Sequence, residues 1–172
     1  MAPQAYMPGT VVSRNDSRIA AEISGKVKWV APEGTLLKEG EVLAEIDDRN
    51  LGLALNRAHS QVKRLEARIV YLRADLDRVR ELAENKNVPS SRVEEAESTL
   101  LMTEEELAQA RVTAEQAAID LERTKVRAPF PGRVVQRLAQ AGEYSVPGRQ
   151  IARLVDTEHL EVSAQAPVTL SA

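Results

Sequence analysis

Few residues in this chain have the types and spacing that could support catalysis or metal binding. The chain has two histidines, His59 and His159, in different segments, and it has no cysteine. The absence of cysteine excludes a thiolate nucleophile, a disulfide and a cysteine-based zinc site, and two separated histidines favour ordinary surface placement over metal ligation. The adjacent Asp47 and Asp48 could form an acid and base pair. No nucleophile or electrophile accompanies them, so the sequence predicts no catalytic residue, no metal ligand and no bound cofactor.

Composition narrows the function classes further. The 172 residues carry a net charge of -3, with 43% apolar and only 3% aromatic residues. This charge gives no general attraction to nucleic acid, and the basic residues are not interleaved with the aromatic side chains that single-stranded nucleic acid prefers. No run approaches the ~20 apolar residues of a membrane-spanning helix, and no apolar signal core follows Met1.

Two segments, residues 23–48 and 130–156, carry one pattern. In each, a glycine is followed by a basic residue and valine, then by two further glycines, apolar residues and a closing aspartate. Glycine permits tight turns and close backbone approach, so the pattern predicts a duplicated β unit whose halves close into one sandwich. Trp29 is expected in its core. The matching glycines are Gly25 with Gly132, Gly34 with Gly142 and Gly40 with Gly148.

The segment between the repeats, residues 49–126, carries the strongest periodic signal. Apolar and small residues recur at spacings of four and three in two series. The first series is Leu51, Leu55, Ala58, Val62, Leu65, Ile69, Leu72, Leu76, Val79 and Ala83, and the second is Val93, Ala96, Leu100, Thr103, Leu107, Ala110, Ala114, Ala117, Leu121 and Thr124. A repeat of 3.5 residues per turn keeps one seam facing a partner, so the pattern predicts two coiled-coil helices.

A break separates the two series at residues 85–89, which read Asn-Lys-Asn-Val-Pro. Asparagine tolerates a left-handed helix cap, and proline disfavours helix in the residue before it. We therefore expect helices over residues 50–87 and 89–126, packed antiparallel as a hairpin with arms of roughly 55 Å. Ser91 and Glu94 have the spacing of a capping box at the start of the second helix.

The two predicted helices have opposite charge. The first carries eight Lys or Arg against five acids, and the second carries nine acids against four bases. Opposite charge favours pairing, although each exposed pair contributes only some tenths of a kcal/mol. Two interpretations stay open: the arms of one hairpin pair with each other, or the edges of neighbouring hairpins meet side by side in an assembly.

The duplicated pattern resembles biotinyl and lipoyl carrier domains, in which a short hairpin between the halves displays a modified lysine. Here residues 49–126 take the place of that hairpin. A lipoyl-like domain split by a long helical hairpin resembles the periplasmic adaptor proteins, or membrane fusion proteins, of efflux pumps and type I secretion systems. The phrase Arg127-Ala128-Pro129 is similar to the family's return into the second half. The resemblance covers nearly the whole chain, about residues 9–167.

The resemblance implies an α+β fold with defined domains. A lipoyl-like β-sandwich (barrel-sandwich hybrid) would occupy residues 9–48 and 127–160, split by the antiparallel coiled-coil α-hairpin of residues 49–126. Residues 1–8 and 161–172 would lead to a missing β-barrel domain, and we expect the chain to be a fragment. The alternation over residues 159–164 predicts an outgoing strand.

Adaptors of the resistance-nodulation-division class carry a signature around the hairpin tip: Arg, Leu four residues later, Ser seven beyond that, then an acid and Ala on the return helix. Arg78, Leu82, Glu94 and Ala96 fit this signature, whereas Pro89 stands in the place of the serine. In a purely structural interpretation, the apolar residues only close the seam and the serines only cap the helix. The residues that the resemblance implies for partner binding are Arg78, Leu82, Val88, Pro89, Ser90, Ser91 and Glu94.

The function implied by the resemblance is mechanical. Such adaptors link an inner-membrane transporter to an outer-membrane TolC-like channel, and several copies form a ring whose hairpin tips meet the channel. The expected location is the periplasm, with an inner-membrane anchor in the full-length protein. No cofactor and no nucleic acid partner are expected.

Two alternatives belong to other classes. A carrier domain would be acylated or biotinylated on lysine, and Lys26 and Lys38 lie in the first repeat, although neither is at the junction between the halves. An intracellular coiled-coil tether could also be built on a lipoyl-like base. An upstream signal or anchor in the full-length sequence would separate the adaptor from the tether.

Overall fold

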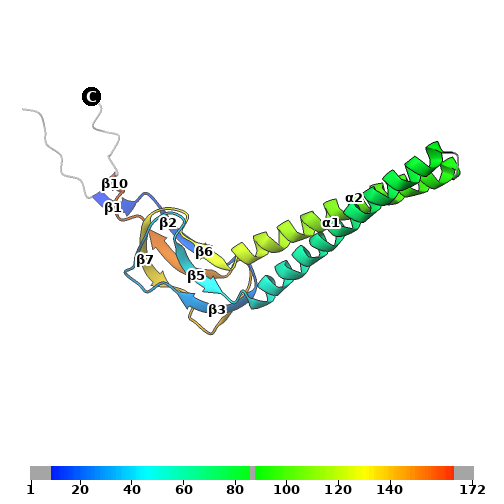
Figure 1. Cartoon of the computed structure of the whole chain (residues 1–172). Coiled ribbons are helices and arrows are strands. Elements are labelled where there is room, and N and C mark those ends of the chain that lie inside the picture. The colour runs from blue at the N-terminus through cyan, green and yellow to red at the C-terminus, as the bar shows by residue number, and fades with distance from the viewer. Residues whose placement is uncertain (1–8, 86–87, 165–172) are drawn as a thin grey trace, which may run out of the picture. The chain divides into compact units, whose positions relative to one another are not determined.

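The computed structural model describes residues 9–85 and 88–164, which form two compact units. One unit combines the residues up to Asp47 with those from Arg123 onward, and the other is the segment Asp48–Glu122. Figure 1 shows the strands of the first unit and the paired helices of the second. The elements are β1 (Gly9–Ser13), β2 (Asp16–Ala20), β3 (Gly25–Val30), β4 (Leu36–Leu37), β5 (Val42–Ile46), α1 (Arg49–Glu84), α2 (Ser90–Glu122), β6 (Lys125–Arg127), β7 (Gly132–Arg137), β8 (Tyr144–Ser145), β9 (Gln150–Val155) and β10 (Leu160–Ala164).

The first unit is a sandwich in which the two repeats are interleaved. One four-stranded sheet has the order β2-β9-β7-β4 and the other has the order β6-β5-β3-β8. The short strand of each repeat therefore pairs with the long strand of the other, as β4 with β7 and β8 with β3. The predicted duplicated sandwich is confirmed, and neither repeat forms a sheet from its own strands alone.

Equivalent glycines make equivalent contacts in the two halves. The Gly34 amide donates to the Val134 carbonyl at 2.7 Å, and the Gly142 amide donates to the Val27 carbonyl at 2.8 Å. Both glycines have positive φ, of 89° and 97°, which side chains rarely adopt. The glycine pattern of the sequence thus marks two turns that lock each repeat onto the other.

The core of the sandwich is aliphatic and comes from both repeats. Val27 and Ile46 of the first repeat pack in one cluster with Val134 and Ile151 of the second, and all four are buried. The prediction that Trp29 lies in this core is wrong, because its side chain is 43% exposed. A register shift between Val27 and Trp29 breaks the alternation of β3, so that Lys28 and Trp29 both face outward.

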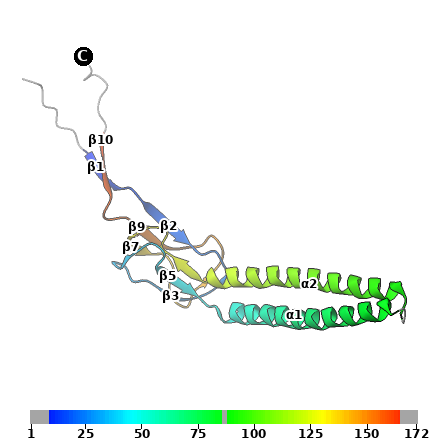
Figure 2. The same cartoon turned by 45° about the horizontal axis from the view of Figure 1, so that its top comes forward.

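The second unit is the predicted antiparallel hairpin, in which α1 and α2 lie side by side in both views (Figures 1 and 2). Every seam residue of α1 and of α2 is buried or half-buried. The helix bounds differ from the prediction at both ends. Helix α1 ends at Glu84, where the amide and side chain of Asn85 donate to the Glu81 carbonyl at φ -80° rather than in a left-handed cap. The predicted end of this helix at Asn87 falls outside the described residues.

Helix α2 begins at Ser90 and ends at Glu122, before the expected Val126. Ser91 therefore lies within the first turn instead of at the cap, and the capping-box prediction is wrong. At the other end, Thr124 continues the heptad spacing but belongs to the unit of the sandwich. The Thr124 carbonyl accepts the Ile46 amide at 2.8 Å, and β6 pairs with β5.

The predicted outgoing strand is confirmed as β10, which pairs antiparallel with β1. Together they form a two-stranded ribbon in the same unit as the sandwich. Residues 1–8 and 165–172 lie outside the described residues.

Candidate functional site at the hairpin tip

The candidate tip residues of α1 are exposed at the end of the helix where the chain turns back. Arg78 lies on the surface, and its guanidinium is 3.3 Å from the Asp75 carboxylate one turn earlier. Leu82 is 40% exposed and lies beside the buried seam of the hairpin. The seam at this end is closed by Val79 and Ala83 instead. Leu82 therefore lies at the edge of the seam, with part of its side chain open to solvent.

The candidate residues on the return side also face solvent, with one exception. Pro89, Ser90, Ser91 and Glu94 are exposed, and Val88 is half-buried. The Arg92 amide donates to the Pro89 carbonyl at 3.0 Å, which closes the first turn of α2. The structure thus brings the predicted residues to one end of the hairpin. Lys86 and Asn87, between them, are outside the described part of the chain.

Two ion pairs that the sequence prediction did not include lie at this end. Arg80 and Glu97 join the two helices at 2.7 Å, and Arg92 and Glu95 join successive turns of α2 at 2.6 Å. The hydrogen bond that the Arg92 guanidinium donates to the Glu95 carboxylate, together with the negative charge of that carboxylate, raises the pKa of Arg92. Exposed pairs of this kind contribute little free energy, but they fix the orientation of side chains.

The oppositely charged helices of the hairpin are joined by ion pairs along their length. Three ion pairs cross from one helix to the other at intervals of seven residues, on one edge of the seam. They are Glu66 with Arg111 at 2.9 Å, Arg73 with Glu104 at 2.7 Å and Arg80 with Glu97 at 2.7 Å. The interpretation that the arms of one hairpin pair with each other is therefore confirmed.

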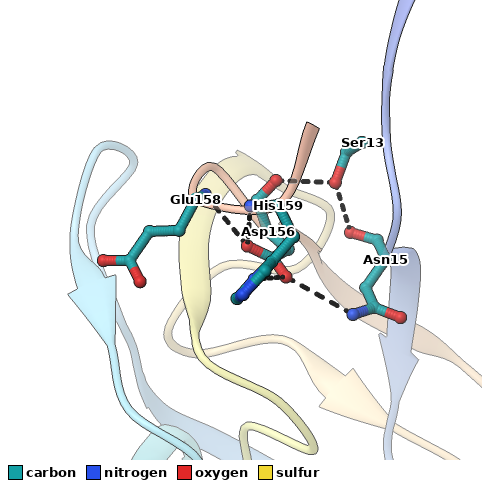
Figure 3. Close-up of polar contacts among 5 residues, drawn as sticks. All are labelled: Ser13, Asn15, Asp156, Glu158 and His159. Carbon is teal, nitrogen blue, oxygen red and sulfur yellow. Dashed lines mark hydrogen bonds and ion pairs between the residues drawn. The ribbon is translucent and has the colours of Figure 1, made fainter. Parts of the chain in front are cut away.

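A polar cluster that the sequence analysis missed lies where the sandwich meets the β1–β10 ribbon (Figure 3). The buried carboxylate of Asp156 accepts hydrogen bonds from the amides of Glu158 at 2.9 Å and His159 at 3.1 Å. Its Oδ2 lies 2.9 Å from His159 Nδ1 and 3.4 Å from Asn15 Nδ2. The Asp156 carbonyl accepts the Ser13 hydroxyl at 2.6 Å.

The cluster holds the Asp156 carboxylate in its charged form. Burial raises the pKa of this carboxyl, but the hydrogen bonds from the Glu158 and His159 amides and from the His159 ring outweigh burial. Together with the charge of His159 they lower the pKa from 3.8 to about 2. Part of this cluster is local in sequence, because the Asp156 side chain accepts hydrogen bonds from the amides two and three residues later. The contacts with Ser13 and Asn15 join distant segments, which local spacing does not predict.

The predicted tip residues present the cation of Arg78, the anion of Glu94, the hydroxyls of Ser90 and Ser91 and the exposed side chain of Leu82, with the two ion pairs beside them. Among the described residues, no group of three or more His, Cys, Asp or Glu side chains is placed to hold a metal ion. Within residues 9–85 and 88–164, no helix combines the length and apolar character needed to cross a membrane. The arrangement is suited to binding another protein surface.

Comparison with known proteins extends this description. The multidrug resistance protein MdtA of Xenorhabdus bovienii (strain SS-2004) is 28% identical over 137 residues, which cover 79% of this chain and 33% of that protein. MdtA of Yersinia pestis (strain Pestoides F) is 28% identical over 156 residues, covering 87% of this chain and 34% of that protein. The chain thus spans about a third of the length of these curated relatives.

Solved structures share the fold. MacA from Actinobacillus actinomycetemcomitans matches with a TM-score of 0.78 at 21% identity, over 94% of this chain and 55% of that one. The membrane fusion protein Spr0693 from Streptococcus pneumoniae R6 matches with a TM-score of 0.69 at 21% identity, over 90% and 64%. The model of the CzcB-like, barrel-sandwich hybrid domain matches residues 15–156. This chain therefore belongs to the CzcB-like barrel-sandwich hybrid domain family, and it has the fold of the membrane fusion proteins.

Proposed function

We propose that this chain is the lipoyl-like and hairpin part of a periplasmic adaptor in a tripartite efflux or secretion system. In this role the hairpin tip contacts an outer-membrane channel of the TolC-like kind, and the remainder of the protein contacts an inner-membrane transporter. The relatives named multidrug resistance protein support an efflux role. The protein would act by binding and spacing its partners, without catalysis and without a cofactor.

The observation that supports this proposal is a long hairpin with a buried seam whose turning end carries the exposed side chains of Arg78, Leu82 and Glu94. A helix of 36 residues has a length of roughly 54 Å at 1.5 Å per residue. A rod of this length places a small contact surface far from its base. Arg78 and Glu94 give that surface charges of both signs, which favours a specific orientation on a partner.

The further domains and the location follow from the same proposal. Strand β1 precedes Asn15, strand β10 follows Asp156, and the two strands pair with each other as a ribbon. In this proposal the ribbon is the start of a β-barrel domain. The full-length protein would be anchored in the inner membrane and would stand in the periplasm as a ring of several copies.

The experiment is an efflux assay with the full-length protein carrying Arg78→Asp or Leu82→Ser. Both variants should lose transport while circular dichroism shows an intact hairpin, because both side chains are exposed and outside the seam. Leu53→Ser is the matched control, since Leu53 is also exposed, at 55%, and lies at the opposite end of α1. Arg137→Asp makes the same charge change on β7. Normal efflux in both tip variants would show that transport does not depend on contacts made by these tip residues.

A mass measurement tests the carrier alternative independently. In carrier domains the modified lysine stands between the two repeats, where this chain places α1 and α2. The intact mass of the purified protein should therefore equal that of the unmodified polypeptide. An added lipoyl or biotinyl group would replace the adaptor function with a carrier function.

A further inference from the structure

The β1–β10 ribbon is held to the sandwich by polar contacts, while its own large apolar side chains face solvent. These side chains are 42% to 70% exposed, and they are Val11, Val12, Leu160 and Val162. A two-stranded ribbon without a packed face is at best marginally stable in water. The contacts between the ribbon and the sandwich therefore decide how firmly the ribbon is held in this chain.

These contacts converge on Asp156, at the place where two chain segments pass from the sandwich to the ribbon (Figure 3). The Asp156 amide donates to the Asn15 carbonyl at 2.9 Å, and the Arg14 amide donates to the His159 carbonyl at 3.0 Å. The side-chain hydrogen bonds of Asp156 described above join the same two segments. We call this region the joint, and it consists of Ser13, Arg14, Asn15, Asp156, Glu158 and His159.

One hydrogen bond of the joint depends on a proton. His159 Nδ1 lies 2.9 Å from Asp156 Oδ2, and the His159 side chain is 61% exposed, so its ring exchanges protons with solvent. A protonated ring forms an ion pair with the carboxylate, whereas a neutral ring donates a hydrogen bond from Nδ1 without the charge. A charge-assisted hydrogen bond is about twice as strong as a neutral one. The bond between His159 and Asp156 therefore weakens when the ring loses its proton.

The carboxylate of this pair keeps its charge over the range in which histidine titrates. The pKa of Asp156 is lowered from 3.8 to about 2, so its side chain is an anion at every pH above about 4. Histidine side chains ordinarily change charge between about pH 5 and 8. Within the pair, the ring of His159 is thus the partner that responds to pH in this range.

Other charged side chains belong to the elements that meet at the joint. They are Arg14 and Asp16 on the first segment, Glu158 and Glu161 on the second, and Lys38 and Arg133 beside β4 and on β7. Lys38 lines a cavity of about 250 Å³ together with Asp156 and Glu158. Arginine, lysine, aspartate and glutamate ordinarily keep their charge between about pH 5 and 8. These groups give the joint a constant electrostatic background.

We propose that His159 and Asp156 form a proton-operated latch between the sandwich and the β1–β10 ribbon. A charged His159 ring holds the joint closed, and loss of the proton lets the joint open more often. The sign follows from the charges, because a positive ring is attracted to the Asp156 carboxylate and a neutral ring lacks that attraction. Mild acid therefore tightens the joint, and rising pH loosens it.

The latch itself does not depend on the proposed adaptor function. It can be measured on this chain alone, without a transporter or a channel. In an adaptor whose β-barrel domain follows the ribbon, the latch would make the stiffness of that connection depend on acidity. Only this consequence rests on the proposed function.

Hydrogen exchange of the backbone amides of β1 and β10 measures how often the joint opens. Each rate is divided by the intrinsic exchange rate at the same pH, which removes the effect of pH on the exchange chemistry. In the natural chain, the protection of these amides should be about two- to fivefold greater at about pH 5.5 than at about pH 7.5, the effect of one partly exposed ion pair. The amides of β3 and β5, in the other sheet, are the internal reference and should keep one protection at both pH values.

The variant His159→Gln removes the charge of the ring and keeps a donor. Its ribbon amides should have the protection of the natural chain at the higher pH, and that protection should not change with pH. His59→Gln is the matched control, because His59 is exposed on α1 in the other unit, and this variant should keep the full pH response. A response that survives His159→Gln would overturn the latch. A natural chain with no response, or with greater protection at the higher pH, would overturn it as well.

The variant Asp156→Asn tests the other member of the pair. Asparagine keeps an acceptor oxygen but has no charge, so the pH response of the ribbon should disappear. Its protection should also fall at both pH values, because the Glu158 and His159 amides lose a charged acceptor. Unchanged protection of the β3 and β5 amides shows that the sandwich is folded in each variant. A pH response that persists in Asp156→Asn would assign it to another group and reject the latch.

The latch and the tip contact fail in distinguishable ways. The tip variants Arg78→Asp and Leu82→Ser should leave the exchange of the ribbon amides unchanged, because both residues belong to the other unit. Normal efflux in those variants would reject the tip contact and retain the latch. A ribbon without a pH response would reject the latch, whatever the result of the efflux assay.

Discussion

Gly132 lies so close to Val155 that a Cβ at residue 132 would come within 2.7 Å of the Val155 carbonyl oxygen. The neighbouring atoms belong to the backbone of β9, so no side-chain rotation can relieve the clash. We expect Gly132→Ala to lower the free energy of unfolding of the sandwich by about 1–3 kcal/mol. The measurement is urea unfolding followed by fluorescence of Trp29, the single tryptophan, which lies in β3.

A second glycine serves as the control for Gly132. A Cβ at Gly52 would meet nothing within 4 Å, and Gly52 lies inside α1. Gly52→Ala should therefore stabilise the hairpin by up to about 1 kcal/mol through helix propensity. Equal destabilisation by both substitutions would contradict the close approach of β7 and β9.

The seam of the hairpin should be sensitive to lost apolar volume. Leu65 is 2% exposed and packs in one cluster with Ile69, Leu107 and Ala110. We expect Leu65→Ala to destabilise the hairpin by about 2–4 kcal/mol, measured by the helical circular dichroism signal during thermal unfolding. Leu53→Ala makes the same change at a residue that is 55% exposed, and it should alter stability by less than about 0.5 kcal/mol. Similar losses from the two substitutions would contradict the assigned seam.

The Asp156 cluster should make the sandwich sensitive to acid. The pKa of Asp156 is lowered from 3.8 to about 2 in the folded protein. The unfolded chain therefore binds a proton at Asp156 before the folded chain does, and the stabilisation is present above about pH 3.8 and is lost as the pH falls toward 2. Trp29 fluorescence during urea unfolding at several pH values measures this loss.

The variant Asp156→Asn isolates that contribution from other carboxylates. Asp16 also has a lowered pKa, because of its hydrogen bond with Arg153, and it titrates in both proteins. The unfolding free energies of the natural chain and of Asp156→Asn should therefore differ most above pH 3.8 and converge toward pH 2. A difference that stays constant with pH would exclude this role for the carboxylate.

The ion pairs between the arms should contribute little to stability. Arg80 and Glu97 are about half exposed, so solvent screens their attraction. We expect Arg80→Ala to lower hairpin stability by less than about 1 kcal/mol, measured by thermal unfolding. The exchange of both charges, Arg80→Glu with Glu97→Arg, should recover most of that loss. A loss of several kcal/mol would mean that the pair is far less hydrated than its exposure indicates.

The hairpin could be predicted from sequence because its pattern is local. Residues such as Leu65 and Ile69 are buried for the same reason that they recur at spacings of three and four. The repeat could be predicted because Gly34 and Gly142 lie at equivalent turns, and both turns have the positive φ that favours glycine. These two signals established the fold and the end of the hairpin at which the candidate residues gather.

Other features depend on contacts that the local pattern does not contain. Thr124 continues the heptad spacing, yet its carbonyl accepts a hydrogen bond from Ile46 in the sandwich. Trp29 follows an alternation that a bulge in β3 interrupts. The partners of Asp156 include Ser13 and Asn15, which only the folded sandwich brings to it. Spacing alone predicts none of these outcomes.

The cross-pairing of β4 with β7 and of β8 with β3 has a consequence for the order of folding. During synthesis the first repeat cannot complete a sheet until the second repeat has left the ribosome, because each needs the other's strands. The helical hairpin is one continuous segment, Asp48–Glu122, and its helices pack on each other without a strand of either repeat. Its closure shortens the effective loop between the repeats, which reduces the entropy lost when they join. The helical hairpin is therefore expected to fold before the sandwich.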